Sequence, residues 1–459
     1  MLLAAGLLKI SARHAAASVA SGFSPDSQVQ IDAAKSFRYV TRKGAGSHDG
    51  QDWRNAMPVN WVSKAQAAAA PGAAFLIGSE PVDPHPIELG RKKPQIFLRT
   101  SGTKETPIIV LAGDIAGNDS LMLPAPDDAA PRFRNVDPWS VETFGKSKGA
   151  PFFLGIERDA SHIFLAGFRM AGTSGDGFFK FRHGKAKSAS FDGITFADIA
   201  GTDIGRVIET DQGAKLSNIV IRDCRAFGIV RGFARFHHLA QSVLRDLDLD
   251  ANGLDGGAKN VCQLIAVDKG TDILFENITL RNAVSTKTLA GGGEGYTQGD
   301  GIVCESGTRN VTIRNCHASN MGDAAFDLKT SGVKIEKSSS EHCKFGARIW
   351  SKAENLIRDC TFRQPVTRAG TEGCCIQVSG LCDIVNTTLQ VGDGTFALGF
   401  NKLKRGDTPV IRMHGGAIEL SADGGLARGN ATGILELHDV AVNGETRSGS
   451  HHLENNILR

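Results

Sequence analysis

Acidic and basic residues that could do chemistry gather between residues 300 and 348 of the sequence. Asp300 and Asp323 each follow a glycine, and Asp327, Lys329 and Arg348 come next along the chain. A lysine can act as a base only if its pKa falls, which a nearby cation such as Arg348 favours and a nearby carboxylate such as Asp327 opposes. The sequence alone leaves open which of these two effects prevails at Lys329.

The three aspartates allow two kinds of chemistry. If Asp300, Asp323 and Asp327 come from stacked turns of chain about 4.8 Å apart, their oxygens could hold Ca²⁺, which takes roughly six to eight oxygen ligands. A pair of carboxylic acids at such a separation is also what glycoside hydrolysis requires. A plainer interpretation is that Asp300 and Asp323 are turn residues, since Gly-Asp pairs form turns without any ligand.

The elements that position these residues belong to a repeat. Between Asn310 and Phe362 the sequence runs through an aliphatic strand, a polar turn and a second strand, and then repeats this order with a period of roughly 22 residues. The apolar residues alternate with polar ones and include many β-branched side chains, which is typical of strands. These features predict an all-β fold, a right-handed parallel β-helix, in which each repeat is one coil.

Each coil is predicted to contain an apolar anchor followed two positions later by a turn residue. The anchors are Leu165, Phe191, Ile221, Leu244, Phe275, Ile313, Ile335, Ile357, Val385 and Leu437. The second position holds Asn, Asp or Gly, residues that tolerate left-handed backbone angles, except for Lys337 and Thr387. We expect the coils to become irregular from about Gly392.

Alternation along the strands separates inward from outward side chains. Phe326, Leu328 and Ile349 are predicted to face inward and build the coil, while Asp327, Lys329 and Arg348 face outward together. Other outward residues form a face of mixed charge suited to an anionic sugar chain. The residues predicted to bind substrate there are Arg235, His237, Glu305 and Gln377. A solvated face without function would show the same pattern, because charged residues must point outward somewhere.

The domain organisation follows from the repeats. Residues 1–36 are expected to be flexible or signal-like, and residues 37–459 to form one β-helix domain, with a cap at about 37–80 and coils at about 90–445. An alanine-rich helical segment ending near Ala70 is predicted to cover the open end of the first coil, which would otherwise expose unpaired strand edges. The segment from Pro124 to Lys148 is expected to be an inserted loop.

The composition excludes several classes of protein. A net charge of +3 does not indicate a nucleic-acid partner, and no apolar run is long enough to span a membrane. Cys224, Cys316 and Cys360 occupy one position of the repeat, and the nine cysteines lack the paired spacing of a metal cluster. We therefore expect them to be small core residues. The apolar N-terminus weakly favours export from the cytoplasm.

The segment from Phe326 to Phe362 resembles the catalytic coils of polysaccharide lyases of the alginate lyase and chondroitinase B type. Its FDLKT, GARIW and NLIRDCTF stand where those enzymes carry an acidic strand entering KS, an LRHG strand and an N-x-I-x-x-N-x-F strand. The GDAAFD segment is similar to the calcium motif of family nine pectate lyases. This resemblance implies that Lys329 is the base that takes the C5 proton of a uronate, that Arg348 is the matching arginine, and that Ca²⁺ neutralises the uronate carboxylate.

We therefore predict a secreted or periplasmic polysaccharide lyase that cleaves a uronate-containing acidic polysaccharide by β-elimination. Lys329 and Arg348 would be catalytic, and Asp300, Asp323 and Asp327 would bind Ca²⁺. Three alternatives use the same scaffold: a C5-epimerase, a glycoside hydrolase with two of the aspartates as acid and base, and a non-catalytic glycan-binding β-helix. The sequence predicts neither the identity of the polysaccharide nor the oligomeric state.

Overall fold

The protein is described here by a computed structural model that covers residues 33–41, 44–79, 96–114, 154–171, 177–254, 261–285, 296–351, 353–401, 408–429, 432–453 and 457–458. These residues form two compact units that divide between Arg225 and Ala226, within strand β14 (Val220–Phe236). The predicted inserted loop from Pro124 to Lys148 lies outside the described residues, as does nearly all of the predicted flexible segment 1–36.

The first unit consists of short parallel strands. One sheet runs in the order β1, β3, β5, β7, β11 and β14, and a second in the order β4, β6, β9 and β12. The strands are β1 Ser36–Thr41, β2 Met57–Pro58, β3 Ala73–Ser79, β4 Ile96–Leu98, β5 Ile108–Asp114, β6 Leu154–Glu157, β7 Ile163–Ala166, β8 Arg169–Ala171, β9 Phe179–Arg182, β10 Ala189–Asp192, β11 Ile194–Ala197, β12 Ala200–Thr210 and β13 Ala214–Ser217.

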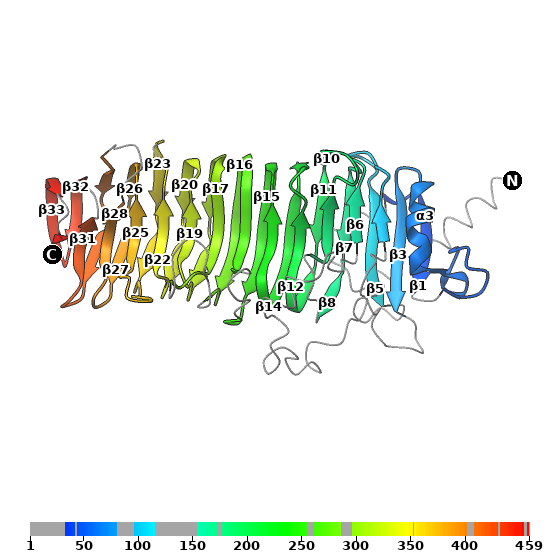
Figure 1. Cartoon of the computed structure of the whole chain (residues 1–459), viewed down its shortest axis with the longest axis horizontal. Helices are drawn as coiled ribbons and strands as arrows, with labels where there is room; N and C mark the ends of the chain where they lie inside the picture. The colour runs from blue at the N-terminus through cyan, green and yellow to red at the C-terminus, as the bar shows by residue number, and fades with distance from the viewer. Residues whose placement is uncertain are drawn as a thin grey trace. The chain divides into compact units, whose positions relative to one another are not determined.

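The predicted capping helix is present as α3 (Val62–Ala67), which follows the short 3₁₀ turns η2 (Trp53–Asn55) and η3 (Val59–Trp61). Figure 1 shows α3 beside β3 at the N-terminal end of this unit. Gln66 is fully buried, accepts a hydrogen bond from the Arg99 backbone N–H and donates one to the Thr100 carbonyl, while Ser63 Oγ accepts one from the Phe97 N–H. The helix thus supplies hydrogen-bond partners along β4 and the residues just after it, which is how an exposed sheet edge is covered.

The second unit winds through three parallel sheets. Sheet 1 contains β19, β22, β25, β28 and β31, sheet 2 contains β20, β23, β26 and β29, and sheet 3 contains β18, β21, β24, β27 and β30. The strands are β15 Leu239–Asp250, β16 Gln263–Arg281, β17 Asp300–Arg314, β18 His317–Ser319, β19 Ala324–Leu328, β20 Ser331–Glu336, β21 Ser339–Glu341, β22 Phe345–Ile349, β23 Asn355–Arg358, β24 Thr361–Arg363, β25 Cys374–Val378, β26 Leu381–Val385, β27 Thr388–Val391, β28 Phe396–Phe400, β29 Val410–His414, β30 Ala417–Leu420, β31 Gly425–Gly429, β32 Gly433–Val442, β33 Glu445–Leu453 and β34 Ile457–Leu458. In the last coils β33 and β34 pair antiparallel with β32 and β31, which ends the parallel winding.

Stacked anchors form the core, with two differences in register from the prediction. Ile357 lies in register with Ile384 and not with Val385, because the strand is shifted by one residue from the predicted position. Leu165 and Ile221 both align with Phe196, whereas the predicted anchor Phe191 pairs with Leu216 in another sheet.

The C-terminal coils are also more regular than expected. Ile384, Met413 and Leu437 are paired in register on β26, β29 and β32, so the winding continues past Gly392 and includes a coil that the prediction lacked. All three side chains are buried.

The turn position after each anchor has a left-handed backbone throughout. Its φ is 49° even at Lys337 and 46° at Asn386, the residue that the corrected register puts in place of Thr387. A left-handed backbone at a lysine costs conformational free energy, and the coils on either side hold Lys337 in this conformation.

The cysteines are core residues, as expected. All nine are buried and free. The backbone N–H of Cys316 donates to Ser338 Oγ and that of Cys360 to Thr387 Oγ1, so successive coils fill one position with Cys, Ser, Cys and Thr. Within the described residues, no helix is long and apolar enough to cross a membrane.

Candidate functional site

The predicted catalytic residues lie on the outward side of sheet 1. Asp327 is paired in register with Arg348 on the next strand, and Arg348 with Gln377 on the strand after that. Their inward neighbours Phe326 and Leu328 are fully buried. The strand alternation therefore points the polar side chains away from the core, as the sequence predicted.

Arg348 forms the centre of this arrangement. Its Nη1 donates to Asp323 Oδ2 at 2.8 Å and its Nε to Gln377 Oε1 at 3.1 Å. The guanidinium also lies 4.5 Å from the ring centre of Trp350 and 4.7 Å from that of Phe345. Although burial acts to lower its pKa, the surrounding aspartates raise the pKa of Arg348, so this side chain stays charged.

Lys329 is held between two carboxylates. Its Nζ is 2.9 Å from Glu305 Oε1 and 3.4 Å from Asp327 Oδ2, and about a third of its side chain is exposed. Burial acts to lower the pKa of Lys329, but the charge of Asp327 and the hydrogen bond and charge of Glu305 outweigh it, so the pKa is raised. The competition that the sequence left open is thus resolved in favour of a protonated lysine.

Asp300 and Asp323 retain protons more readily than ordinary aspartates. Burial raises the pKa of Asp300 well above its usual range, and the negative charges of Asp323 and Asp327 add to that effect. Burial likewise raises the pKa of Asp323, in spite of the opposing charge of Arg348 and the hydrogen bond from Tyr296. Carboxyl groups with a raised pKa can serve as proton donors.

These carboxyl groups do not fit a calcium site. Asp323 accepts hydrogen bonds from Arg348 and Tyr296, Asp327 accepts one from Trp350 Nε1 at 2.6 Å and faces Lys329, and Asp300 Oδ1 accepts one from the Ala324 N–H. In the part of the chain that the structure describes, no group of three or more His, Cys, Asp or Glu side chains is arranged to hold a metal ion. The neighbours that hold the oxygens are donors and cations, whereas Ca²⁺ needs many unshared oxygens.

Arg235 and His237 lie further along the same face. Arg235, Ala266, Val303 and Asp327 are paired in register one after another, so Arg235 is three strand spacings, about 14 Å, from Asp327. Arg235 Nη2 and His237 Nδ1 both contact Asp268 Oδ2, at 3.4 Å and 2.5 Å. Burial acts to raise the pKa of Asp268, but these two partners hold it below its usual value. Of the predicted substrate-binding residues, Glu305 contacts Lys329 and Gln377 contacts Arg348, the two residues predicted to be catalytic, whereas Arg235 and His237 lie further away.

Three residues that contact the aspartates of the site were not predicted from the sequence: Tyr296, Lys344 and Trp350. Tyr296 donates a hydrogen bond to Asp323 Oδ1, and Lys344 Nζ lies 3.8 Å from the centre of the Tyr296 ring and 4.0 Å from the same oxygen. Lys344 is completely buried, and burial lowers its pKa. Trp350 and Tyr296 are aromatic residues in otherwise polar segments, which is a usable signal, whereas nothing in the sequence marks Lys344.

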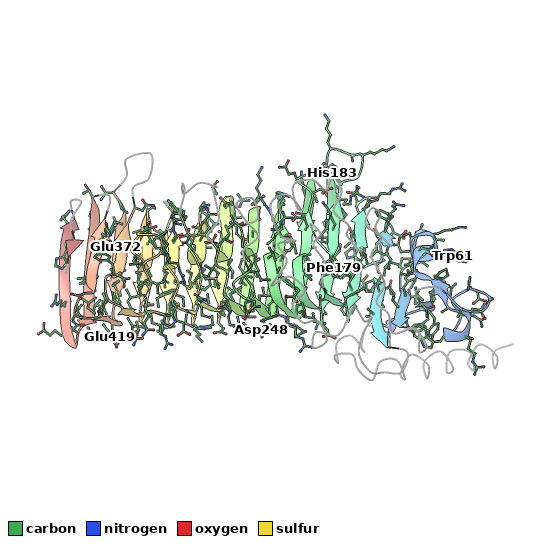
Figure 2. The ribbon with its side chains drawn as sticks, turned by 60° about the horizontal axis from the view of Figure 1, so that its bottom comes forward. Trp61, Phe179, His183, Asp248, Glu372 and Glu419 are labelled. Carbon is green, nitrogen blue, oxygen red and sulfur yellow. The ribbon has the colours of Figure 1, made fainter. Side chains whose placement is uncertain are left out.

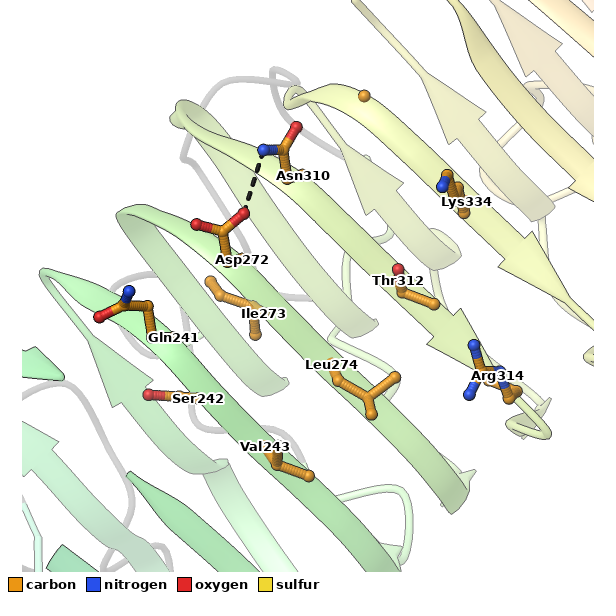
Figure 3. Close-up of a pocket in the computed structure, with 11 residues that line it drawn as sticks. Gln241, Ser242, Val243, Asp272, Ile273, Leu274, Asn310, Thr312, Arg314 and Lys334 are labelled. Carbon is orange, nitrogen blue, oxygen red and sulfur yellow. Dashed lines mark hydrogen bonds between the residues drawn. The ribbon is translucent and has the colours of Figure 1, made fainter. Parts of the chain in front are cut away.

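The described residues of this unit line at least two surface hollows. One, of about 260 Å³, includes Gln377 and therefore adjoins the site. The other, of about 440 Å³, lies over β15, β16, β17 and β20, where Figure 3 shows Asp272 hydrogen-bonded to Asn310, with Leu274 and Thr312 further along the same two strands. It contains no cluster of acids like that at Asp300, so we place the candidate active site next to the smaller hollow.

Comparison with known proteins agrees with this fold. Residues 257–392 match the family model described as the right handed beta helix region. Among curated proteins, none matches the chain significantly.

Three solved structures match most of the length of the chain. A pectate lyase, Pel9A, is 15% identical, with 78% of this chain and 81% of that chain covered and a TM-score of 0.49. An alginate lyase from a Paenibacillus species is 10% identical, with 87% and 100% covered and a TM-score of 0.39. A DFA-IIIase from Arthrobacter chlorophenolicus is 11% identical, with 85% and 93% covered and a TM-score of 0.42. With the stacked register described above, the family match confirms the predicted fold, a right-handed parallel β-helix with an N-terminal capping helix.

Proposed function

We propose that this protein is a polysaccharide lyase that cleaves a uronate-containing acidic polysaccharide by β-elimination. The observation that carries the proposal is the pair of cations on the outward side of sheet 1. Lys329 directly follows β19, and Arg348 lies on the neighbouring strand β22. Both contact carboxylates; Lys329 is partly open to solvent, whereas Arg348 is mostly buried. A bound uronate carboxylate could replace one of these partners and use the same cations.

The roles follow from the chemistry of elimination. The guanidinium of Arg348 binds the uronate carboxylate and stabilises the negative charge that develops when the C5 proton leaves. Lys329 Nζ, in its deprotonated form, takes that proton, and the electron pair forms a double bond between C4 and C5. The bond from C4 to the glycosidic oxygen breaks, and that oxygen takes up a proton from water. Glu305 and Gln377 would hold sugar hydroxyls beside the reacting residue, and Arg235 and His237 would contact the chain further away.

A uronate polysaccharide lies outside the cytoplasm, so we propose that the protein is secreted or periplasmic. Its free thiols are compatible with such an oxidising compartment. Burial raises the pKa of Cys343 to about 12 and that of Cys374 to about 12, so the reactive thiolate is rare, and the surrounding side chains block access to it.

The proposal is tested by incubating the purified protein with a panel of uronate polysaccharides and following the ultraviolet absorbance of the unsaturated product. Absorbance should rise with at least one substrate. Lys329→Ala should abolish this activity, and Lys334→Ala, which removes an exposed lysine of β20, should leave it unchanged. Equal turnover by Lys329→Ala and the wild type would remove Lys329 from the role of base.

A glycoside hydrolase is a second candidate, because the raised pKa of Asp300 next to the other aspartates is what a general acid requires. In that case the same incubation would produce reducing ends without the absorbance of a double bond. Asp300→Asn would then abolish the reaction, and Lys329→Ala would reduce it only partly.

A further inference from the structure

One line of outward positions crosses sheet 1 from the candidate active site towards the C-terminus. Arg348, Gln377, Gly399 and Arg428 are paired in register on β22, β25, β28 and β31. Figure 1 shows these strands following one another in the second unit. The line runs across the strands, and it carries a cation at each end.

The smaller hollow lies along this line. It has a volume of about 260 Å³ and extends from Gln377, which is hydrogen-bonded to Arg348, to Arg428. Gly399 lies midway, and a Cβ at this position would stand 2.8 Å from Cys374 Sγ and 3.5 Å from Gln377 Cγ. The absence of a side chain at Gly399 therefore keeps the space between the two polar ends open.

The floor of the hollow is apolar. Phe345, Cys374 and Phe396 form a buried cluster on successive strands, and the Arg428 guanidinium lies 5.5 Å from the centre of the Phe396 ring. Glu372 forms an ion pair with Arg428 at the rim. An apolar floor with a few charged groups at its edge suits a sugar ring that bears one carboxylate.

We propose that this hollow is a binding subsite for a second uronate of the same polysaccharide, with Arg428 pairing with its carboxylate. The inference rests on the proposed function, since it takes the reacting uronate to lie at Arg348. Arg428 is three strand spacings, about 14 Å, from Arg348. A sugar residue in a linear chain is about as long as one strand spacing, so the uronate at Arg428 is about three residues from the one that reacts.

The guanidinium of Arg428 favours this occupant over a neutral sugar, and the carboxylate of Glu372 opposes it. A guanidinium can bind a carboxylate through two parallel hydrogen bonds and has donors left for a second acceptor. Glu372 competes for those donors and repels an incoming carboxylate. Removing Arg428 should therefore lower the affinity for uronate oligosaccharides, and removing the charge of Glu372 should raise it.

The test measures binding by calorimetry in the Lys329→Ala background, which prevents turnover, using oligouronates of two and six residues. Arg428→Met should weaken binding of the hexamer about tenfold, the value of one hydrogen bond between charged groups. It should leave binding of the dimer unchanged. Glu372→Gln should tighten binding of the hexamer several-fold.

Two matched controls use residues away from the hollow. Arg412→Met removes an arginine of similar exposure on β29, in sheet 2, where it pairs with Glu436. Glu419→Gln removes an exposed acid of β30; Figure 2 labels Glu372 and Glu419 at different edges of the coils. Neither control should change the affinity for the hexamer.

Several outcomes would overturn the subsite. They are an equal loss for dimer and hexamer in Arg428→Met, no loss for either, or no binding of the hexamer by the Lys329→Ala protein. Failure of the proposed function looks different. If the hexamer binds in an Arg428-dependent way but the wild type never produces an unsaturated product, the subsite stands and the lyase reaction does not.

Discussion

Replacing Glu305 by glutamine should lower the pKa of Lys329 and shift the pH profile of the proposed lyase to more acidic values. In the free protein Glu305 accepts a hydrogen bond from Lys329 Nζ at 2.9 Å, and its charge acts with that of Asp327 to raise the lysine pKa. Glutamine keeps the size and an acceptor oxygen but removes the charge. A base must be deprotonated to act, so a lower pKa means a larger active fraction at neutral pH.

The size of the shift follows from the exposure of the pair. The side chains of Lys329 and Glu305 are 34% and 37% exposed, so solvent screens their interaction as it does at a surface. Such pairs contribute about 0.2–1 kcal/mol. Since about 1.4 kcal/mol is a factor of ten, removing this charge should increase the deprotonated, active fraction of Lys329 by up to about fivefold where protonation limits the rate.

The assay is kcat/KM against pH, because this ratio reports the groups of the free enzyme. The wild type should gain about tenfold per pH unit from neutral into alkaline pH, since the base has a raised pKa. Glu305→Gln should show the same slope displaced to lower pH, even if lost sugar contacts lower its plateau. Glu436→Gln, which removes an acid of β32 paired with Arg412, should leave the profile unchanged. A wild-type optimum at neutral pH, or an alkaline displacement by Glu305→Gln, would refute Lys329 as the base.

Three further outcomes are expected. Dialysis against a chelator, or addition of Ca²⁺, should leave the activity and the unfolding midpoint unchanged, because Asp323 and Asp327 are held by side-chain donors; a clear Ca²⁺-dependent rise in the midpoint would show that this reasoning is wrong. Arg348→Met should destabilise the fold by about 3 kcal/mol through loss of a buried ion pair. Burial raises the pKa of Asp323 and the charge of Arg348 opposes this effect, so the pKa of Asp323 should rise further in the variant. A carboxyl group whose pKa is raised in the folded state destabilises the fold as the pH rises through that pKa. The urea midpoint of the variant should therefore fall most at pH 8 and less at pH 5. A thiol reagent should find few reactive cysteines in the native protein and all nine after denaturation; rapid native labelling would contradict the burial of these residues.

The coil architecture could be predicted because its signal is local. An apolar anchor followed by a residue that tolerates a left-handed backbone recurs in each coil, and this pattern needs no knowledge of the neighbouring coils. The register could not be predicted where two adjacent residues fit equally well. Ile384 and Val385 are both β-branched, and only their pairing with the coil around Ile357 decides between them. A different ambiguity led to Phe191 being predicted in place of Phe196: the two residues lie on consecutive strands, and each precedes a turn residue by two positions.

The errors in register also explain why Arg428 was not found. The prediction treated the chain beyond Gly392 as irregular, so no outward line could be drawn from Arg348 through Gly399 to Arg428. Once β28 and β31 are placed in register, the line follows from pairing alone. To predict a binding residue on a solenoid, the register of every coil between that residue and the candidate active site must therefore be known.

The electrostatics of the candidate site depends on contacts that no motif contains. The sequence left open whether Arg348 lowers or Asp327 raises the pKa of Lys329. The guanidinium of Arg348 pairs with Asp323 and Gln377, while Asp327, together with Glu305 from the preceding coil, raises that pKa. Lys344, whose position before β22 shows no pattern, adds a buried amine 4.0 Å from Asp323 Oδ1. The acids at Asp300, Asp323 and Asp327 resemble a calcium motif, but whether such acids bind a metal is decided by the basic and donor residues that neighbouring coils place against them. In this protein those positions hold Arg348, Lys329, Tyr296 and Trp350, so the charge balance of the site is provided by the chain itself.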